Sequence, residues 1–138
     1  MNILYQTQAS ATGGRNGHVV SADGVLDLKL AIPREMGGPG GALSNPEQLF
    51  AAGYAACFDS ALAFVAGQSK LRLTGTRVDA TVGIGPNAAG GFGLAVKLEV
   101  TIPELPREQA QALLEKTHTV CPYSNALRGN VEVELVLK

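Results

Sequence analysis

The longest apolar stretch of the chain, residues 49–66, constrains its fold more than any other feature. A helix-start signal precedes it, because Asn45 can cap a helix and Pro46 suits the first helical position. The pattern predicts a helix from about residue 46 to about residue 68. Such a helix is apolar on nearly every face, so protein must cover it on several sides. Its alanine-rich composition and Asp59 near its middle argue against a membrane span.

Alternating apolar residues predict strands on both sides of this helix. The segment "VLDLKLA" at 25–31 alternates leucine with polar residues, as in a strand with one buried face. Residues 78–84 and 94–102 carry two more apolar rows, and the glycine-rich "GPNAAGGFG" between them predicts a hairpin. Weaker alternation over residues 2–11 and clear alternation in the final "NVEVELVLK" predict one strand at each end of the chain.

Two further helices and one irregular loop complete the expected elements. Pro106 begins an amphipathic helix. Its apolar face would consist of Ala110, Leu113, Leu114 and Thr117. The segment "CPYSNALRG" is a short helical piece that ends at Gly129, whereas the glycines and prolines of "PREMGGPGGALS" predict a mobile loop or lid. This order predicts an α+β fold with a mainly antiparallel sheet, in a single domain over residues 1–138.

Composition narrows the class of protein. The chain has 138 residues, of which 46% are hydrophobic, and a net charge of -1, which fits one globular domain. It offers neither the basic surface of a nucleic-acid-binding protein nor the polar excess of a disordered chain. The opening "MNILYQTQAS" lacks the features of a signal peptide, so we expect a cytoplasmic protein with no membrane partner.

The two cysteines, Cys57 and Cys121, are the main candidates for chemistry. They form neither a CxxC nor a four-cysteine pattern, which argues against a thioredoxin motif and a zinc knuckle. In a reducing compartment such a pair is more often transient, catalytic or metal-binding than structural. Cys57 could equally fill space in the helix core, where ionisation is costly. Cys121 precedes Pro122 at a predicted helix start, where amide donors favour a thiolate, so the residues alone nominate Cys121.

Three polar residues stand out beside the cysteines, and each has an ordinary alternative. Arg15 in "GGRNG" could face water, and Glu47 could simply complement the positive end of its helix. His118 could be a metal ligand or a base for Cys121, but a histidine on a helix surface is the default and no ligand cluster supports zinc.

Three segments of the sequence together resemble a known family: "GGRNG", "GGPGGALSNPEQLFAAGYAACF" and "CPYSNALRGN". In order and spacing they closely resemble the organic hydroperoxide resistance (Ohr) family of the OsmC-like superfamily, over nearly the whole chain. The resemblance implies antiparallel sheets wrapped around a long buried central helix, in an intertwined homodimer. It also implies a thiol peroxidase, without metal, that reduces organic and lipid hydroperoxides to alcohols.

The resemblance also implies roles for particular residues. Cys57 would be the peroxidatic cysteine that becomes a sulfenic acid, and Cys121 would resolve it through an intrachain disulfide, which agrees with thiol chemistry. Arg15 would bring a cation to Cys57, with Glu47 as its orienting partner. Asn16 departs from the family pattern, because relatives often carry Asp there. Dihydrolipoyl groups would re-reduce the disulfide, so a lipoylated protein, or dihydrolipoamide, is the implied reductant.

Apolar residues near Cys57 predict the substrate class. The predicted substrate-binding residues are Phe50, Tyr54 and Phe58 on the helix and Met36 on the loop. An alkyl chain buried there gains roughly 0.8 kcal/mol per CH₂, which hydrogen peroxide cannot gain. We therefore expect a preference for alkyl or fatty-acid hydroperoxides.

The spacing of Glu47 and Cys57 bears on the assembly. Along an unbroken helix the two positions lie about 15 Å apart and about 80° around the axis. A kink near Gly53 or a partner helix would allow one site to contain both. The apolarity of residues 49–66 favours a partner, since a small domain has few elements to cover every face of such a helix.

Two other functions remain open from the sequence. One is an OsmC-type peroxidase with a different reductant or substrate range. The other is a non-catalytic protein that binds apolar ligands, with structural cysteines.

Overall fold

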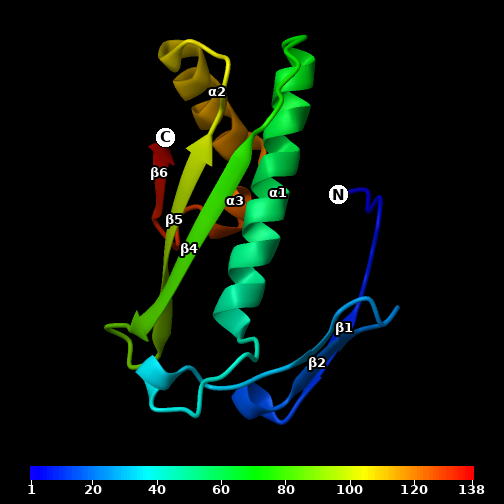
Figure 1. Ribbon diagram of the computed structural model, residues 1–138, viewed down its shortest axis with the longest axis vertical. Coiled ribbons are helices and arrows are strands. Elements are labelled where there is room, and N and C mark those ends of the chain that lie inside the picture. The colour runs from blue at the N-terminus through cyan, green and yellow to red at the C-terminus, as the bar shows by residue number, and fades with distance from the viewer. The chain divides into compact units, whose positions relative to one another are not determined.

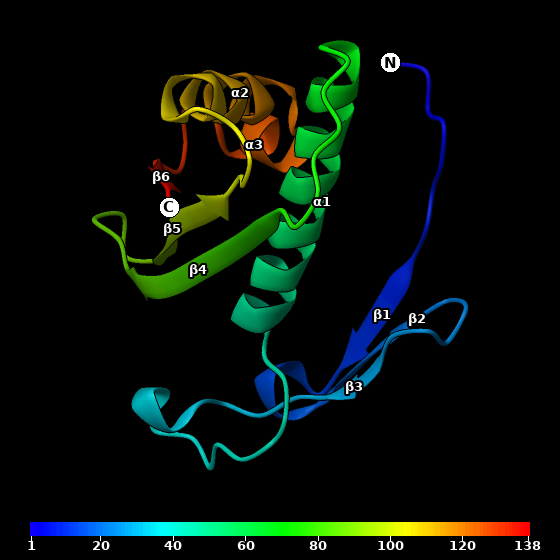
Figure 2. The same ribbon diagram turned by 45° about the horizontal axis from the view of Figure 1, so that its top comes forward.

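The computed structural model describes all 138 residues and divides into two compact units, Met1–Leu49 and Phe50–Lys138. The first unit is a small antiparallel sheet, labelled in Figure 2, with the order β1 (Ala9–Thr12), β2 (His18–Ser21) and β3 (Asp27–Lys29). Its two single-turn 3₁₀ helices are η1 (Gly14–Asn16) and η2 (Arg34–Met36). Leu30 and Ala31 are its only buried hydrophobic residues.

Glycines make the β1–β2 connection possible. Gly13 and Gly14 have positive φ angles of 72° and 58°, which residues with a side chain rarely adopt. A Cβ at Gly17 would lie 1.7 Å from the carbonyl oxygen of Thr12, so no other residue fits there. The turn that carries Arg15 therefore has a backbone specified by its glycines.

The long helix α1 (Pro46–Gln68) begins in the first unit and continues through the second. Its bounds match the predicted helix. The backbone N–H of Gln48 donates to Oδ1 of Asn45 at 2.8 Å, which confirms Asn45 as the cap.

The second unit packs α1 with a three-stranded sheet and two helices. The sheet has the order β4 (Arg77–Pro86), β5 (Phe92–Thr101) and β6 (Val133–Leu137). β4 and β5 form the predicted antiparallel hairpin, whereas β6 runs parallel to β5. The chain between β5 and β6 forms α2 (Arg107–Val120) and α3 (Pro122–Leu127), the crossover that a parallel pair requires. Figures 1 and 2 both show α1 beside this hairpin and these helices.

The core of the second unit joins α1, β5 and α2. Its largest fully buried apolar side chains are Tyr54, Phe58, Leu62, Val65, Leu98, Val100 and Leu114. The four residues of α2 expected on its apolar face are all buried. By length and composition alone α1 could cross a membrane, but its place in this packing identifies it as the core helix of a soluble protein. Asp59 accepts a hydrogen bond from Oγ1 of Thr76 at 2.9 Å, which satisfies the charged residue in the middle of the helix.

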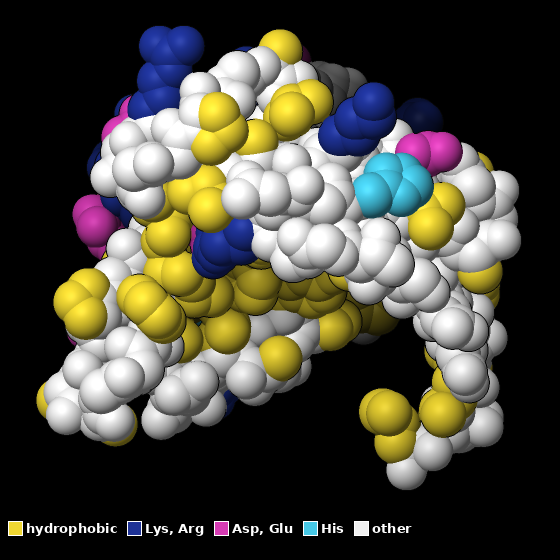
Figure 3. Space-filling view, turned by 90° about the horizontal axis from the view of Figure 1, so that it is seen from below, with side chains coloured by type: hydrophobic (Ala, Val, Ile, Leu, Met, Phe, Trp, Pro, Cys, Tyr) yellow, Lys and Arg dark blue, Asp and Glu magenta, His cyan; other side chains and the backbone are white.

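One face of α1 nevertheless remains uncovered in the single chain. Small residues follow one another along it at helical spacing, and Phe64 beside them is 58% exposed. The exposed positions are Ala52, Ala56, Ser60, Ala63, Phe64 and Gly67. Figure 3 shows hydrophobic side chains, in yellow, that are likewise uncovered on the face it presents.

Two strand predictions were wrong in extent. The first strand was predicted over residues 2–11, but residues 2–8 form no strand, and the strand that pairs is Ala9–Thr12. Leu26 is 49% exposed because it lies in the β2–β3 turn, where its N–H bonds to Oγ of Ser21, rather than on a buried strand face. The expectation of a single domain over residues 1–138 stays a prediction.

Candidate active site

The two cysteine sulfurs lie side by side in the second unit. Cys57 is on α1, and Cys121 lies at the junction where α2 ends and α3 begins. Their Sγ atoms are 3.6 Å apart, and both cysteines are free. Cys121 is fully buried, whereas Cys57 is only partly buried. The pair is thus close enough for a small movement to bring the sulfurs to the roughly 2.05 Å of a disulfide.

The surroundings of Cys57 disfavour its thiolate. Burial is the largest cause and raises the pKa of the Cys57 thiol, and the neighbouring Cys121 also raises it. The backbone N–H of Tyr123, at the start of α3, hydrogen-bonds to Cys57 and lowers the pKa. No cation is among the groups that shift this pKa. An ionised Cys57 therefore needs a positive charge that these neighbours do not supply.

The charged pair predicted at the helix start is present in the first unit. Both terminal nitrogens of Arg15 donate to the carboxylate of Glu47, at 2.8 and 2.5 Å. Their side chains are 29% and 13% exposed, so the pair is partly desolvated. The hydrogen bond from Arg15 is the largest cause that lowers the pKa of Glu47 and keeps it ionised. A planar guanidinium held by two bonds is a fixed, oriented cation.

Asn16 fastens the turn that carries Arg15. Its Oδ1 accepts a hydrogen bond from the backbone N–H of Ile32 at 3.2 Å. A carboxylate oxygen could accept the same bond, so Asp at this position would keep the acceptor.

A buried hydroxyl network near the cysteines was missed by the sequence analysis. Oγ of Ser124 lies 2.8 Å from the Tyr54 hydroxyl and 2.9 Å from Nδ1 of His118. Tyr54 and Ser124 are buried, and His118 is half-buried. The only signal in the sequence was a serine three residues after Cys121, which by itself reads as an ordinary helix residue. His118 thus has a hydrogen-bonding partner rather than a free surface position.

The predicted substrate-binding residues are not equally accessible. Phe50, Tyr54, Phe58 and Tyr123 form an aromatic cluster, with ring centroids 5.8–6.4 Å apart. Tyr54 and Phe58 are fully buried and Phe50 is half-buried. Met36 is exposed at the end of η2 in the first unit. Their contact with a substrate stays a prediction.

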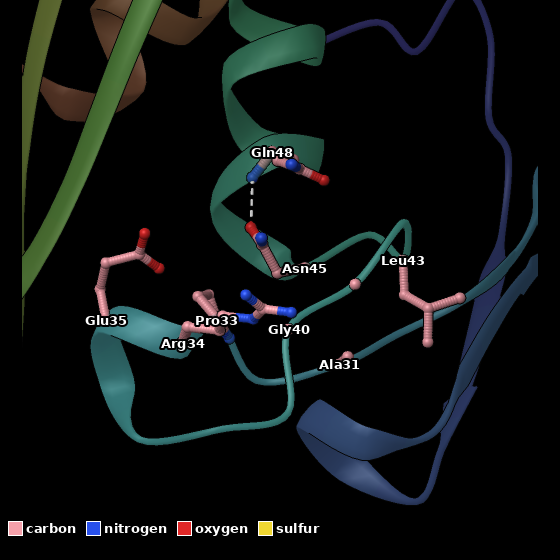
Figure 4. A pocket seen from close by; sticks show the side chains of 9 residues that line it. Ala31, Pro33, Arg34, Glu35, Gly40, Leu43, Asn45 and Gln48 are labelled. Carbon is pink, nitrogen blue, oxygen red and sulfur yellow. Dashed lines mark hydrogen bonds between the residues drawn. The ribbon is translucent and has the colours of Figure 1, made fainter.

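A polar cavity of about 290 Å³ lies in the first unit. Arg34 and Glu35 line one side of it, and Asn45 and Gln48 at the start of α1 line another, as Figure 4 shows. Neither cysteine lines it. No group of three or more His, Cys, Asp or Glu side chains is arranged to hold a metal ion.

Comparison with known proteins decides the family. Residues 38–136 match the OsmC-like protein family. The chain is 54% identical to an organic hydroperoxide resistance protein of Xanthomonas axonopodis pv. citri over 136 residues, 98% of this chain and 95% of that protein. It is 44% identical to the organic hydroperoxide resistance protein OhrB of Bacillus subtilis, with 98% of each chain covered. This chain belongs to the Ohr family. It is therefore a cysteine-based organic hydroperoxide peroxidase.

Solved structures give the same result for the fold. An Ohr protein of Elizabethkingia anophelis superposes with a TM-score of 0.96 at 54% identity, covering 100% of this chain and 99% of that one. OhrB of Bacillus subtilis superposes with a TM-score of 0.90 at 43% identity, covering 99% and 100%. The chain thus has the expected α+β OsmC-like fold, with two small sheets and a long helix. The nearness of its two cysteines is consistent with an Ohr thiol peroxidase.

Proposed function

We propose that Cys57 is the peroxidatic cysteine of this Ohr enzyme and Cys121 its resolving cysteine, and the 3.6 Å separation of their sulfurs carries the proposal. The Cys57 thiolate attacks the distal oxygen of ROOH, the O–O bond breaks, and the leaving alkoxide takes a proton to give ROH. Cys57 becomes a sulfenic acid. The Cys121 thiol then attacks the sulfenic sulfur, which forms a disulfide and releases water.

Exposure supports this order of roles over the reverse. Cys57 is partly exposed and Cys121 has no exposed surface, so a peroxide reaches Cys57 first. Cys121 stands at a helix start, but a buried cysteine that no peroxide reaches does not react with one. The backbone N–H of Tyr123 supports a negative charge on Cys57 instead.

Arg15 supplies the cation that the neighbours of Cys57 lack. Glu47 accepts two hydrogen bonds from the guanidinium and keeps it in one orientation. The guanidinium lowers the pKa of the Cys57 thiol and stabilises the charge that develops on the leaving oxygen. Its glycine turn releases it once oxidation removes the charge on sulfur.

The active unit is an intertwined homodimer, and two features of the single chain support this. The first unit has only Leu30 and Ala31 as a core, too little for about 50 residues to be stable alone. The second feature is the uncovered small-residue face of α1, which includes the exposed Phe64. In the dimer, Glu47 of one chain orients the arginine that acts on Cys57 of its partner. Within one chain, Glu47 and Cys57 are about 15 Å apart along the helix, too far for one site to contain both.

Subunit mixing tests the shared site. An inactive Cys57→Ser protein and an inactive Glu47→Ala protein are exchanged under conditions that scramble subunits. Heterodimers then contain one intact site and recover activity. Proven exchange without recovered activity would mean that Glu47 and Cys57 of one site come from the same chain.

The substrate is an organic or fatty-acid hydroperoxide, and the reductant is a dihydrolipoyl group of a lipoylated protein in the cytoplasm. The aromatic cluster next to Cys57, with Phe50 half-exposed at its edge, supports an apolar substrate. Equal catalytic efficiency on cumene hydroperoxide and hydrogen peroxide would refute the preference. Turnover with thioredoxin but not with dihydrolipoamide would indicate a different OsmC-type peroxidase.

The cysteine roles are tested by single-turnover oxidation of two variants. Cys121→Ser should consume about one equivalent of peroxide and retain a sulfenic acid, whereas Cys57→Ser should consume none. The opposite result would exchange the roles. If neither the wild-type protein nor Cys121→Ser consumes peroxide, the chain is instead a binding protein for apolar ligands.

A further inference from the structure

The Tyr54–Ser124–His118 network joins the three helices that carry the two cysteines. Tyr54 lies on α1 one turn before Cys57. His118 lies in the last turn of α2, three residues before Cys121. Ser124 is in α3, three residues after Cys121, and its single Oγ contacts both partners. One buried hydroxyl thus ties together all the segments that determine the distance between the sulfurs.

We propose that Ser124 is a positioning residue that holds Cys121 ready for disulfide formation and thereby protects Cys57 from overoxidation. The inference rests on the proposed roles of the two cysteines. None of the reacting atoms is supplied by Ser124 itself. Its effect passes through α3, which begins directly after Cys121.

Both partners of Ser124 are in the protonation state that the network needs. Burial is the largest cause that raises the pKa of Tyr54, so its phenol stays protonated and can donate. Burial is also the largest cause that lowers the pKa of His118, followed by Arg128, so the imidazole is neutral near pH 7 and one ring nitrogen can accept. A serine hydroxyl can donate to one partner and accept from the other, and no buried side-chain polar atom is left without a partner.

Close packing at α3 adds to this restraint. A Cβ at Gly53 would lie 3.2 Å from the hydroxyl oxygen of Tyr123, so the glycine lets α3 lie close against α1. Arg128 donates to the backbone carbonyl of His118 at 3.0 Å and links the end of α3 to α2. With this packing in place, loss of the Ser124 hydroxyl would leave the buried phenol of Tyr54 unpaired and shift α3 against α1.

Two reactions compete for the Cys57 sulfenic acid. In one, the Cys121 thiol forms the Cys57–Cys121 disulfide and releases water, which requires the sulfurs to close from 3.6 Å to roughly 2.05 Å. In the other, a second ROOH oxidises the sulfenic acid to a sulfinic acid and leaves as ROH, which a thiol does not reverse. A misplaced Cys121 slows only the first reaction, so more Cys57 is overoxidised.

The experiment measures both outcomes in one oxidation. Wild-type protein, Ser124→Ala and Ser124→Thr are mixed with cumene hydroperoxide, quenched over time, and analysed by mass spectrometry for sulfenic acid, disulfide and sulfinic acid. Ser124→Ala should form sulfenic acid within about twofold of wild type, but form disulfide about tenfold more slowly and accumulate more sulfinic acid. Ser124→Thr keeps a hydroxyl and should recover much of the disulfide rate.

Other variants separate positioning from a general loss of structure. Ser69→Ala removes an exposed serine after α1 and should behave as wild type. Tyr54→Phe keeps the ring and removes only the hydroxyl on the other side of the network, so its disulfide formation should be slowed too, and this variant tests the network even if Ser124→Ala does not fold. His118→Asn places an amide near the position of Nδ1 and should retain more of the disulfide rate than His118→Leu.

The outcomes distinguish this inference from the proposed function. Disulfide formation at the wild-type rate in both Ser124→Ala and Tyr54→Phe, with no additional sulfinic acid, would overturn the positioning role. If wild-type protein forms sulfenic acid but never the disulfide, the proposed resolving role of Cys121 fails, and the inference fails with it. Slow disulfide formation with unchanged sulfenic acid formation supports both.

Discussion

The charged pair and the sulfur pair of this enzyme lie in two units that are stabilised in different ways. Arg15 and Glu47 are in Met1–Leu49, where glycine turns and backbone hydrogen bonds specify the structure and only two hydrophobic residues are buried. Cys57 and Cys121 are in Phe50–Lys138, within a packed core of large apolar side chains. The cation is thus held by directed bonds and the thiols by packing.

This difference follows from the chemistry of the two pairs. A guanidinium is costly to bury and needs a carboxylate partner, so it suits a unit with partial solvent access. Disulfide formation needs two sulfurs held close together, which a packed core achieves. The core also raises the pKa of Cys57, so a Cys57 thiolate depends on a charge that its own neighbours do not provide.

The largest effect should come from replacing the cation while the core is kept. Arg15→Gln removes the charge, so kcat/KM for an organic hydroperoxide should fall about 100-fold, with little change in thermal stability. Arg77→Gln is the matched control, because Arg77 forms an exposed ion pair with Asp79 on β4. Steady-state kinetics and thermal melts of both variants provide the test. An equal, small fall in kcat/KM in both would mean that Arg15 takes no part in the reaction.

A cavity in the core should lower the stability of the protein, whereas loss of the Arg15 charge should lower its activity. Leu62 is fully buried on α1, and Leu62→Ala should lower the free energy of unfolding by about 2–5 kcal/mol. Val25 is 81% exposed at the β2–β3 turn, and Val25→Thr should change it by less than about 0.5 kcal/mol. Urea unfolding of the two variants measures the contrast between the units. A similar loss in both would mean that the first unit is packed as tightly as the second.

The sequence predicted the second unit better than the first. Long periodic patterns fix elements well, so the bounds of α1, the β4–β5 hairpin and the four buried residues of α2 followed from residue types. The first unit has short strands and little buried surface, so Leu26 alternates like a core residue but lies half-exposed in a turn. Alternation predicts a face, but not whether the protein has anything to cover it.

Only those contacts of the site that the family motifs imply could be predicted from the sequence. Arg15 and Glu47 were paired by resemblance, and the structure confirms their contact. Nothing in the sequence linked Ser124 to Tyr54, because they are 70 residues apart and their contact depends on how α3 packs against α1. The spacing of 64 residues between the cysteines likewise says nothing of distance until the elements are packed.

The smallest expected effect is on the pH dependence of stability. Glu47 in the first unit and His118 in the second should contribute to stability over different pH ranges. Glu47 has its pKa lowered from 4.5 by Arg15, so its contribution to stability is present above about pH 4.5 and is lost as the pH falls through its lower folded value. His118 has its pKa lowered from 6.5 by burial, so the fold favours the neutral ring. Its contribution is present above about pH 6.5 and is lost as the pH falls below that value.

The two losses can be removed one at a time. Unfolding free energies are measured at about pH 8, 5.5 and 4 for wild type, Glu47→Gln and His118→Asn. His118→Asn keeps a hydrogen-bonding group but cannot titrate, so it should lack the wild-type loss between pH 8 and 5.5. Glu47→Gln should keep that loss and lack the part that appears between pH 5.5 and 4. If His118→Asn also removes part of the loss below pH 5.5, the folded pKa of His118 lies further below its usual value, and the network excludes a proton more strongly. If neither variant alters the curve, other carboxylates set the acid limit, and neither pair contributes to stability through its charge.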